Sequence, residues 1–280
     1  MSPIDLHSHS TASDGLLTPT ELVLRAKKRH VTHLALTDHD EIAGLSEAQA
    51  AGTSNDVKII SGAELSCLWE RKTIHVVGLF LNPDTPSLIV ALQEVKKTRL
   101  VRGREIAKKL ATAGIANAWE GAHRFVTNND LVSRAHFARF LVDAGYVADQ
   151  QKAFDRYLSE GKPAFVAPPW PSITQSVAVI HDAGGVAVLA HPGRYRLTTT
   201  GRRRLLAEFK DCGGEALEVF SPAHTPNDNE QFIAFAHQFG FAASLGSDFH
   251  GDHSRFDLGE LPPLPAGVTP VWTLRDDFPA

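Results

Sequence analysis

Cysteine is nearly absent from this chain, which has only Cys67 and Cys212 among its 280 residues. Two cysteines are too few to build the disulfide framework that stabilises many small secreted domains. The chain therefore fits a reducing compartment, and we predict a cytoplasmic location.

Long apolar runs and a strong net charge are also absent. No stretch approaches the eighteen apolar residues of a membrane span, and residues 1–5 lack the basic start of a signal peptide. The formal net charge of −4 argues against a general nucleic-acid coat or a membrane-surface protein, because both need a cationic field. We expect no membrane association, and no obligate protein partner is evident.

The chain does have the size and apolar content for a large core, with 43% hydrophobic residues. Short apolar segments alternate with helical segments, and this alternation predicts a mainly parallel sheet. A capping box at Thr18 to Glu21, with Pro19 at the first helical position, marks the start of the first helix. The predicted strands are 4–6, 33–37, 57–60, 73–81, 186–190, 215–220 and 241–245.

The pattern changes around Pro86, where helical segments follow one another with no clear strand. We expect helices over 88–113, 129–144 and 148–158. This region is too long for a plain connection. We therefore predict a discontinuous barrel, residues 1–85 and 160–280, with a helical inserted domain at 86–159 that covers the active-site face. The proline-rich tail from about Gly259 is expected to be irregular.

His7 and His9 are two residues apart, so their imidazoles point the same way on an extended backbone. Asp14 follows in a small polar loop. A structural alternative for any one of these residues is a loop cap or a hydrogen bond in the core. Further ligand-type residues lie within or just after the other predicted strands, and the complete set is His7, His9, Asp14, His39, Glu64, His75, His191, Asp248 and His250.

In a parallel barrel the carboxyl ends of all strands open on one face, where catalytic groups converge. Several carboxylates and crowded imidazoles on that face are costly without cations, and two or three divalent metals would neutralise them. The donors contain no thiolate, so we expect Mn²⁺, with Zn²⁺ or Fe²⁺ as alternatives, and no Cys-type structural zinc.

These motifs resemble the PHP (polymerase and histidinol phosphatase) family. The resemblance covers roughly residues 1–82 and 163–255, with the motifs in the family's order. It is carried by Asp5-Leu6-His7-Ser8-His9, Ser13-Asp14-Gly15, Thr37-Asp38-His39-Asp40, Gly62-Ala63-Glu64, His75, Ala190-His191-Pro192 and Gly246-Ser247-Asp248-Phe249-His250.

The resemblance implies an α/β fold, a distorted (β/α)7 barrel with three metals. It suggests His7, His9, Glu64 and Asp248 for the first metal. It suggests Glu64, His75 and His191 for the second, and Asp14, His39 and His250 for the third. Glu64 would bridge the first two metals.

Such a site suits phosphate ester hydrolysis, in which a metal-bridging hydroxide attacks and the metals stabilise the equatorial oxygens. We predict Asp248, His191 and His9 as catalytic residues. The general acid is left open between Asp248 and a metal-bound water. Ser247 beside Asp248 could suggest a serine hydrolase, but its neighbours are better used as ligands.

The chain looks most like the subgroup that removes the 3′-phosphate of nucleoside 3′,5′-bisphosphates or trims short RNA from its 5′ end. By that resemblance Ser133, Arg134 and Lys162 are predicted to contact the non-reacting phosphate, with Arg194 and His224 as weaker candidates. Each could instead be an exposed charge or a loop residue. The basic runs at 96–109 and 202–204 are expected to be solvated helix faces, or else guides for a short RNA.

The predicted function is a metal-dependent phosphatase whose substrate is a small phosphorylated molecule, a nucleoside 3′,5′-bisphosphate. The alternatives are a 5′–3′ exoribonuclease on short RNA and a histidinol-phosphate phosphatase. A non-catalytic metal-binding module is the alternative outside enzymes, and the intact ligand set argues against it.

Overall fold

The computed structural model describes residues 2–126, 128 and 131–275. It divides into two compact units, Met1–Val90 with Pro171–Ala280, called here the barrel unit, and Ala91–Trp170, called the helical unit. No helix in the described part of the chain is both long and apolar enough to cross a membrane. The idea that an insertion covers the active-site face stays a prediction.

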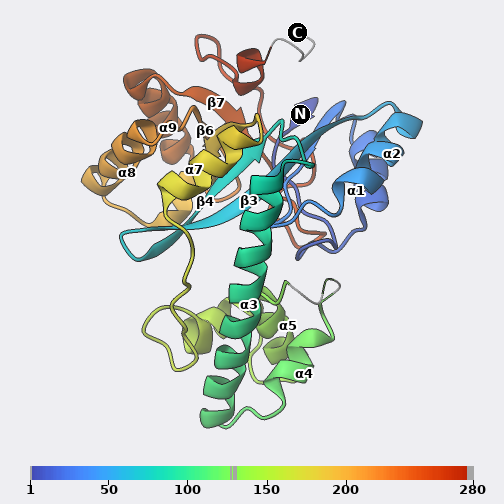
Figure 1. Cartoon of the computed structure of the whole chain (residues 1–280), viewed down its shortest axis with the longest axis vertical. Helices are drawn as coiled ribbons and strands as arrows, with labels where there is room; N and C mark the ends of the chain where they lie inside the picture. Colours follow the sequence, from blue (N-terminus) through green and yellow to red (C-terminus); the bar gives the residue numbers. More distant parts are fainter. Residues whose placement is uncertain (1, 127, 129–130, 276–280) are drawn as a thin grey trace. The chain divides into compact units, whose positions relative to one another are not determined.

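The barrel unit is built on seven strands that pair in sequence order (Figure 1). A backbone hydrogen bond from Leu6 N to Leu245 O, 3.1 Å long, links the two edges of the sheet and nearly closes it. The predicted distorted seven-stranded α/β barrel is therefore confirmed. The strands are β1 Ile4–Asp5, β2 His33–Leu36, β3 Lys58–Trp69, β4 Lys72–Leu79, β5 Val186–Leu189, β6 Ala216–Phe220 and β7 Ala242–Leu245.

One strand departs from the parallel arrangement: β4 runs antiparallel to both β3 and β5. Only Glu70 and Arg71 separate β3 from β4, and both have positive φ angles of 45° and 67°. A two-residue connection with left-handed backbone makes a tight hairpin, whereas a parallel pair needs a long crossover. The reversal places His75 near the start of its strand, opposite Ser66 of β3.

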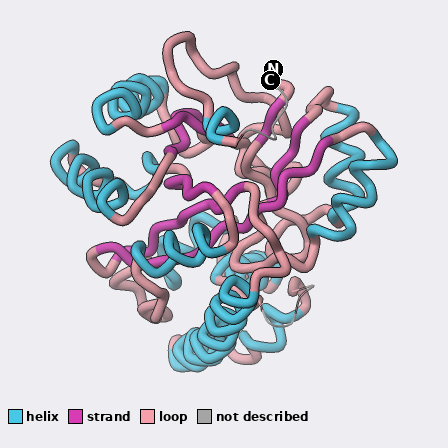
Figure 2. The backbone as a smooth tube through the Cα atoms, turned by 45° about the horizontal axis from the view of Figure 1, so that its top comes forward, coloured by secondary structure: helices cyan, strands magenta, loops and turns pink. Residues whose placement is uncertain are grey.

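Helices surround the strands of the barrel unit (Figure 2). They are α1 Pro19–Lys28, α2 Leu45–Asn55, α7 Ile173–Asp182, α8 Thr199–Asp211 and α9 Pro226–Phe239. The capping box predicted at Thr18 is present. The tail expected to be irregular contains a short 3₁₀ helix, Val271–Leu274.

Two apolar clusters hold this unit together. One fills the barrel interior with small and branched side chains that include Leu6, Val77 and Val188. The other lies between β2 and the helices α1 and α2, and includes Leu22, Leu34 and Ala48. Because these clusters take up the apolar faces of the strands, the polar residues at the strand ends are left to form a separate site.

The helical unit has its own core, which includes Leu110, Phe137 and Leu158. Its elements are most of α3 Pro86–Thr112, then α4 Ala118–His123, α5 Arg134–Asp143, α6 Gln150–Ala153 and a π-helical turn Phe154–Leu158. The predicted segment 129–144 begins at two residues outside the described part of the chain. Its described helix begins at Arg134, after the cap Ser133.

Candidate metal centre

The predicted ligands come together beyond the ends of the strands. His7 and His9 follow β1, His39 follows β2, and Glu64 lies in the part of β3 that extends past β2. A parallel bridge between His39 and Glu64 joins these two segments. Asp248 and His250 follow β7. The hairpin reversal of β4 brings His75 to the same place.

Glu64 is the centre of the cluster and is fully buried. Its Oε1 lies 2.7 Å from His75 Nδ1 and 2.8 Å from His191 Nε2. Its Oε2 faces three further imidazoles at 2.9–3.3 Å, those of His7, His9 and His39. One carboxylate therefore contacts five histidines.

Three groups of donors lie close enough to hold a metal ion each, with all ligand atoms in a group within 4.8 Å of one another. His9, His39 and Glu64 each belong to two groups, so the groups are contiguous. The arrangement differs from the suggested one in that His9 also joins the Asp14 group, and His39 stands in the His75 group where His191 was suggested. His191 belongs to none of the three groups. The groups are His9, Asp14, His39 and His250; His7, His9, Glu64 and Asp248; and His39, Glu64 and His75.

The second group fits a cation better than it fits hydrogen bonding. The Nε2 atoms of His7 and His9 face each other at 3.1 Å. Both nitrogens also lie 3.2–3.5 Å from Glu64 Oε2 and Asp248 Oδ1, and these two buried oxygens form no hydrogen bond. Lone pairs of nitrogen and oxygen that converge without hydrogens between them are the donor set of a divalent metal.

The pKa shifts of Glu64, His75 and His191 also favour metal binding. Burial alone would raise the pKa of Glu64, but the surrounding imidazoles of His39, His75 and His7 hold that pKa well below its usual range. Burial lowers the pKa of His191 to about 3 and also lowers the pKa of His75. An ionised Glu64 and neutral His75 and His191 are the forms that bind metal. Against the effect of burial, the neighbouring carboxylates raise the pKa of His7 well above its usual range and that of His250 to about 9, so these two imidazoles would release a proton when a metal binds.

Sequence reasoning missed the carboxylate that supports this cluster, Glu218 of β6. Its Oε1 lies 2.6 Å from His7 Nδ1, and its Oε2 accepts a 2.6 Å hydrogen bond from His191 N. A carboxylate on the far nitrogen of a ligand histidine fixes the tautomer and the ring orientation. The available signal was a single Glu inside the otherwise apolar segment 216–220.

Three other polar residues order the segments that carry ligands. Asp38 accepts hydrogen bonds from Ser10 N and Oγ at 2.8 and 2.7 Å, in the loop that leads to Asp14. Asp5 accepts from Ser247 N at 2.9 Å. Tyr195 accepts from His75 N and donates to a main-chain carbonyl. These contacts fix the segments that carry the predicted ligands, and they leave the side-chain nitrogen and oxygen atoms of those ligands available for a metal.

Two of the ligand residues have a strained backbone: His191 has φ 30° and Asp248 has φ 48°. Non-glycine residues rarely adopt this left-handed region, and such residues cluster at functional sites. The hydrogen bond from His191 N to Glu218 is what stabilises the first of these conformations.

The five predicted substrate contacts are found in different settings. Arg194 Nη1 lies 3.7 Å from Asp248 Oδ2, and its side chain is 57% exposed. His224 is buried, and its Nε2 accepts from Gly193 N at 3.1 Å while its Nδ1 lies 3.2 Å from Asn229 Oδ1. With both ring nitrogens engaged, His224 holds the turn after His191, and we assign it a positioning role.

The other three lie in the helical unit. Ser133 caps α5, because its Oγ accepts from Ala135 N. The guanidinium of Arg134 lies 5.6 Å from the ring centre of Phe154. Lys162 is exposed, in the loop that follows the π-helical turn.

The expectation that the basic run of α3 is a solvated face is wrong for two residues. Arg99 and Arg102 are only 6% and 7% exposed, and both stack on Trp170 with centroid distances of 4.9 and 5.4 Å. The contact that buries them comes from a residue some seventy positions away in the sequence, so a helical-face pattern could not reveal it.

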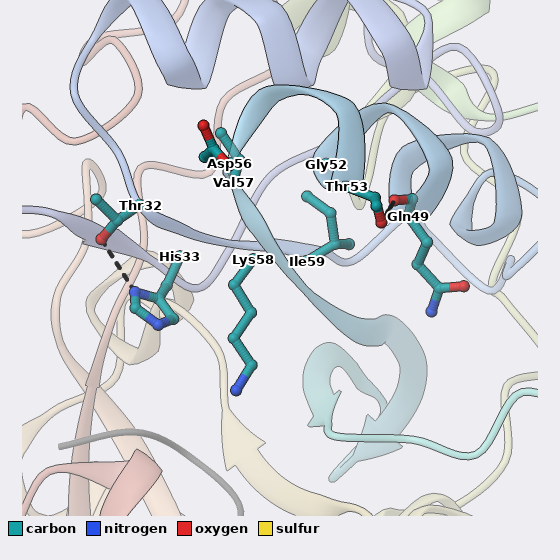
Figure 3. A pocket seen from close by; sticks show the side chains of 9 residues that line it. All are labelled: Thr32, His33, Gln49, Gly52, Thr53, Asp56, Val57, Lys58 and Ile59. Atoms are coloured by element: carbon teal, nitrogen blue, oxygen red, sulfur yellow. Dashed lines mark hydrogen bonds between the residues drawn. The ribbon is translucent and has the colours of Figure 1, made fainter.

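A cavity of about 570 Å³ in the barrel unit lies at the amino ends of β2 and β3, where Thr32, His33 and Lys58 line it (Figure 3). Thr32 Oγ1 bonds His33 Nδ1 at 3.0 Å. None of the metal-type groups found among the described residues includes a lining residue of this cavity. The candidate metal-binding groups therefore lie at the opposite end of the strands from this cavity.

Known proteins are similar to this chain over most of its length. The family model for the PHP domain matches residues 5–160. A 3′,5′-nucleoside bisphosphate phosphatase of Chromobacterium violaceum is 44% identical over 97% of this chain and 96% of its own. A 5′–3′ exoribonuclease, Rnm, of Salmonella typhimurium is 46% identical over 96% of this chain and 92% of its own.

Two solved structures are also similar to this chain over nearly its whole length. An amidohydrolase from Chromobacterium violaceum, with bound sulfate and no metal, aligns with a TM-score of 0.94 at 43% identity, over 98% of this chain and 95% of that one. A metal-dependent phosphoesterase of Bifidobacterium adolescentis aligns with a TM-score of 0.84 at 26% identity, over 97% and 93%. The sequence match, the barrel and the cluster around Glu64 together establish that this chain belongs to the PHP domain family.

Proposed function

We propose that this chain is a metal-dependent phosphoesterase that removes the 3′-phosphate of nucleoside 3′,5′-bisphosphates. The observation that carries the proposal is the contiguous set of three donor groups that share His9, His39 and Glu64. The Chromobacterium phosphatase, 44% identical over nearly the whole chain, supports this substrate class.

Divalent metals in these groups would supply a nucleophilic water at neutral pH and stabilise the charge on a phosphoryl group. We propose two or three metals per chain, with Mn²⁺ as the metal in the cell. The donors are nitrogen and carboxylate oxygen without thiolate, which is compatible with Mn²⁺.

The residues in and around the metal centre have different roles in the proposed reaction. Glu64 belongs to two of the donor groups and would supply negative charge to the cations bound there, and Glu218 fixes the orientation of His7. Arg194, beside Asp248 and largely exposed, is placed to bind a phosphoryl oxygen from the solvent side. We propose Asp248, His191 and His9 as the catalytic residues.

The non-reacting phosphate is proposed to bind Ser133, Arg134 and Lys162. The burial of Arg102 supports an anion in this part of the helical unit. Its Nη2 is buried without a hydrogen-bond partner, and no carboxylate of the described residues pairs with it. Burial, together with the neighbouring charges of Arg134 and Arg99, lowers the pKa of Arg102 to about 9. A buried cation without a counter-ion is costly, so a bound phosphate would stabilise it.

The second candidate function is 5′–3′ exoribonuclease activity on short RNA. Relatives with this name from Salmonella typhimurium, Haemophilus influenzae and Escherichia coli are 43–46% identical to this chain. One hydrolytic site could act on both the diester of a short RNA and the monoester of a mononucleotide.

The test compares three substrates on metal-free protein reloaded with Mn²⁺: adenosine 3′,5′-bisphosphate, histidinol phosphate and a short 5′-phosphorylated RNA. Faster phosphate release from the bisphosphate supports the proposal. If RNA is cleaved to mononucleotides more efficiently than the bisphosphate is hydrolysed, the main activity of the chain is that of an exoribonuclease. If none of the three is turned over, and His9→Ala behaves like wild type, the proposal fails.

A further inference from the structure

The helical unit carries an open cavity of about 830 Å³, and Lys162 is the one residue of its lining that the proposed function uses. It lies between the loop after α5 and the short helices that follow, and its lining includes Tyr146, Lys152, Asp155, Arg156 and Lys162. All of these residues belong to the helical unit. A cavity of this volume is large enough for a nucleotide-sized group.

The cations of this cavity are available for a ligand. Lys152 and Arg156 lie four residues apart, on successive turns, and both are exposed. Among the described residues neither forms an ion pair with a carboxylate, and the same holds for Lys162. The guanidinium of Arg156 lies 5.1 Å from the ring centre of Tyr157, a contact that leaves its charge unpaired. The carboxylate in the lining, Asp155, already accepts a 2.9 Å hydrogen bond from Gln151 Nε2. The cavity therefore presents an excess of positive charge.

An aromatic ring stands beside these cations. Tyr146 is 38% exposed, which is unusual for a large ring in this unit, and the ring centre of Phe140 supports it at 6.2 Å. A supported and exposed ring next to Lys and Arg is the combination on which bases stack while their phosphates are neutralised.

The charge of the helical unit as a whole agrees with a polyanionic ligand. Residues 91–170 contain 13 of the 28 Lys and Arg but only 8 of the 32 Asp and Glu, a formal charge of +5. The rest of the chain has a formal charge of −9. A polyanion would therefore be attracted to the helical unit and repelled by the remainder.

We propose that this cavity binds single-stranded RNA, with phosphates on Lys152, Arg156 and Lys162 and a base stacked on Tyr146. The inference rests on the phosphoesterase function proposed above, and it adds to the second candidate function the residues that would bind the RNA chain. An acidic peptide would also meet the cations, but it would gain nothing from the exposed ring. The exoribonuclease names of several relatives favour RNA.

The test is binding of a fluorescent ten-nucleotide single-stranded RNA to metal-free full-length protein in EDTA, where no cleavage occurs. The double variant Lys152→Ala/Arg156→Ala is expected to bind about tenfold more weakly or worse. Each lost phosphate contact should lower the salt slope by about 0.7. Tyr146→Ala should also weaken binding, with the salt slope unchanged.

The matched control is Lys97→Ala/Lys108→Ala, which removes two charges from α3 of the same unit. This variant should bind RNA like wild type. Equal losses in the control and the test variant would overturn the proposal, since the effect would then come from overall charge. Unchanged RNA binding in Lys152→Ala/Arg156→Ala would also overturn it.

A second measurement keeps this proposal separate from the proposed function. Lys152→Ala/Arg156→Ala, loaded with Mn²⁺, should release phosphate from adenosine 3′,5′-bisphosphate at the wild-type rate. If the double variant instead loses phosphate release from the bisphosphate to the same degree as it loses RNA binding, the cavity binds the mononucleotide. That result would overturn the RNA proposal. If the wild type hydrolyses no phosphate ester, the proposed function fails while the binding result still decides the RNA site.

Discussion

Glu218 joins two residues of the metal centre, because its Oε1 lies 2.6 Å from His7 Nδ1 and its Oε2 accepts from His191 N at 2.6 Å. One buried carboxylate thus sets the tautomer of one histidine and the strained main chain of another. This pair of contacts makes β6, which contributes none of the nine predicted ligands, essential to the site.

Glu218→Gln should lower metal affinity about 10- to 100-fold. If the Gln carbonyl accepts from His191 N, its amide faces His7 Nδ1 and moves the ring proton to Nε2, where a metal would bind. Metal affinity is measured by titration with Mn²⁺. Glu215→Gln is the control, because Glu215 bonds His181 and Ala187 N away from the cluster. Equal affinities for Glu218→Gln and wild type would refute the role of Glu218.

Gly246→Ala should destabilise the protein by about 1–3 kcal/mol and weaken metal binding, because overpacking shifts the neighbouring main chain. A Cβ at this position would lie 2.2 Å from His7 Cβ and 2.8 Å from His7 N. Gly201→Ala serves as the control, since its Cβ would meet nothing closer than 3.4 Å. Chemical denaturation of both variants tests the prediction, and equal stabilities would contradict it.

Arg134→Ala should raise the KM for adenosine 3′,5′-bisphosphate about tenfold or more, the value of one charged hydrogen bond. It should leave hydrolysis of a simple aryl phosphate unchanged, because that substrate has no second phosphate. Steady-state kinetics on both substrates measure the difference. Equal losses on the two substrates would count against a second phosphate site.

Acid should destabilise the protein partly through His224. Burial lowers the pKa of His224 to about 4, below its unfolded value near 6.5. A base with a lowered pKa stabilises the fold above its unfolded pKa, and this contribution is lost as pH falls from 6.5 through 4.

His224→Gln removes this titration. Between pH 7.5 and 4.5 its free energy of unfolding should fall by about 2–3 kcal/mol less than that of wild type. Urea denaturation at both pH values measures this difference. Parallel falls in the two proteins would show that His224 does not contribute.

The barrel and the family could be predicted because their signals are local. Segments such as Asp5-Leu6-His7-Ser8-His9 and Gly246-Ser247-Asp248 put polar residues directly after short apolar strands. Neighbouring residues decide both where such a strand ends and which side chains face the site. The capping box at Thr18 is local in the same sense.

The remaining features depend on contacts between distant parts of the sequence. The β4 reversal follows from the left-handed turn at Glu70 and Arg71, two residues with no glycine to mark it. Glu218 sits in a segment that otherwise fits an apolar core strand. Arg99 and Arg102 belong to a helix of exposed charges, and only Trp170 shows that they are buried.

The most direct measurement is phosphate release from adenosine 3′,5′-bisphosphate while Mn²⁺ is titrated into metal-free protein, with Glu64→Gln in parallel. We predict no phosphate release without metal, a rise that saturates at two to three Mn²⁺ per chain, and no recovery in Glu64→Gln. Release by the metal-free protein, or full activity of Glu64→Gln, would contradict it.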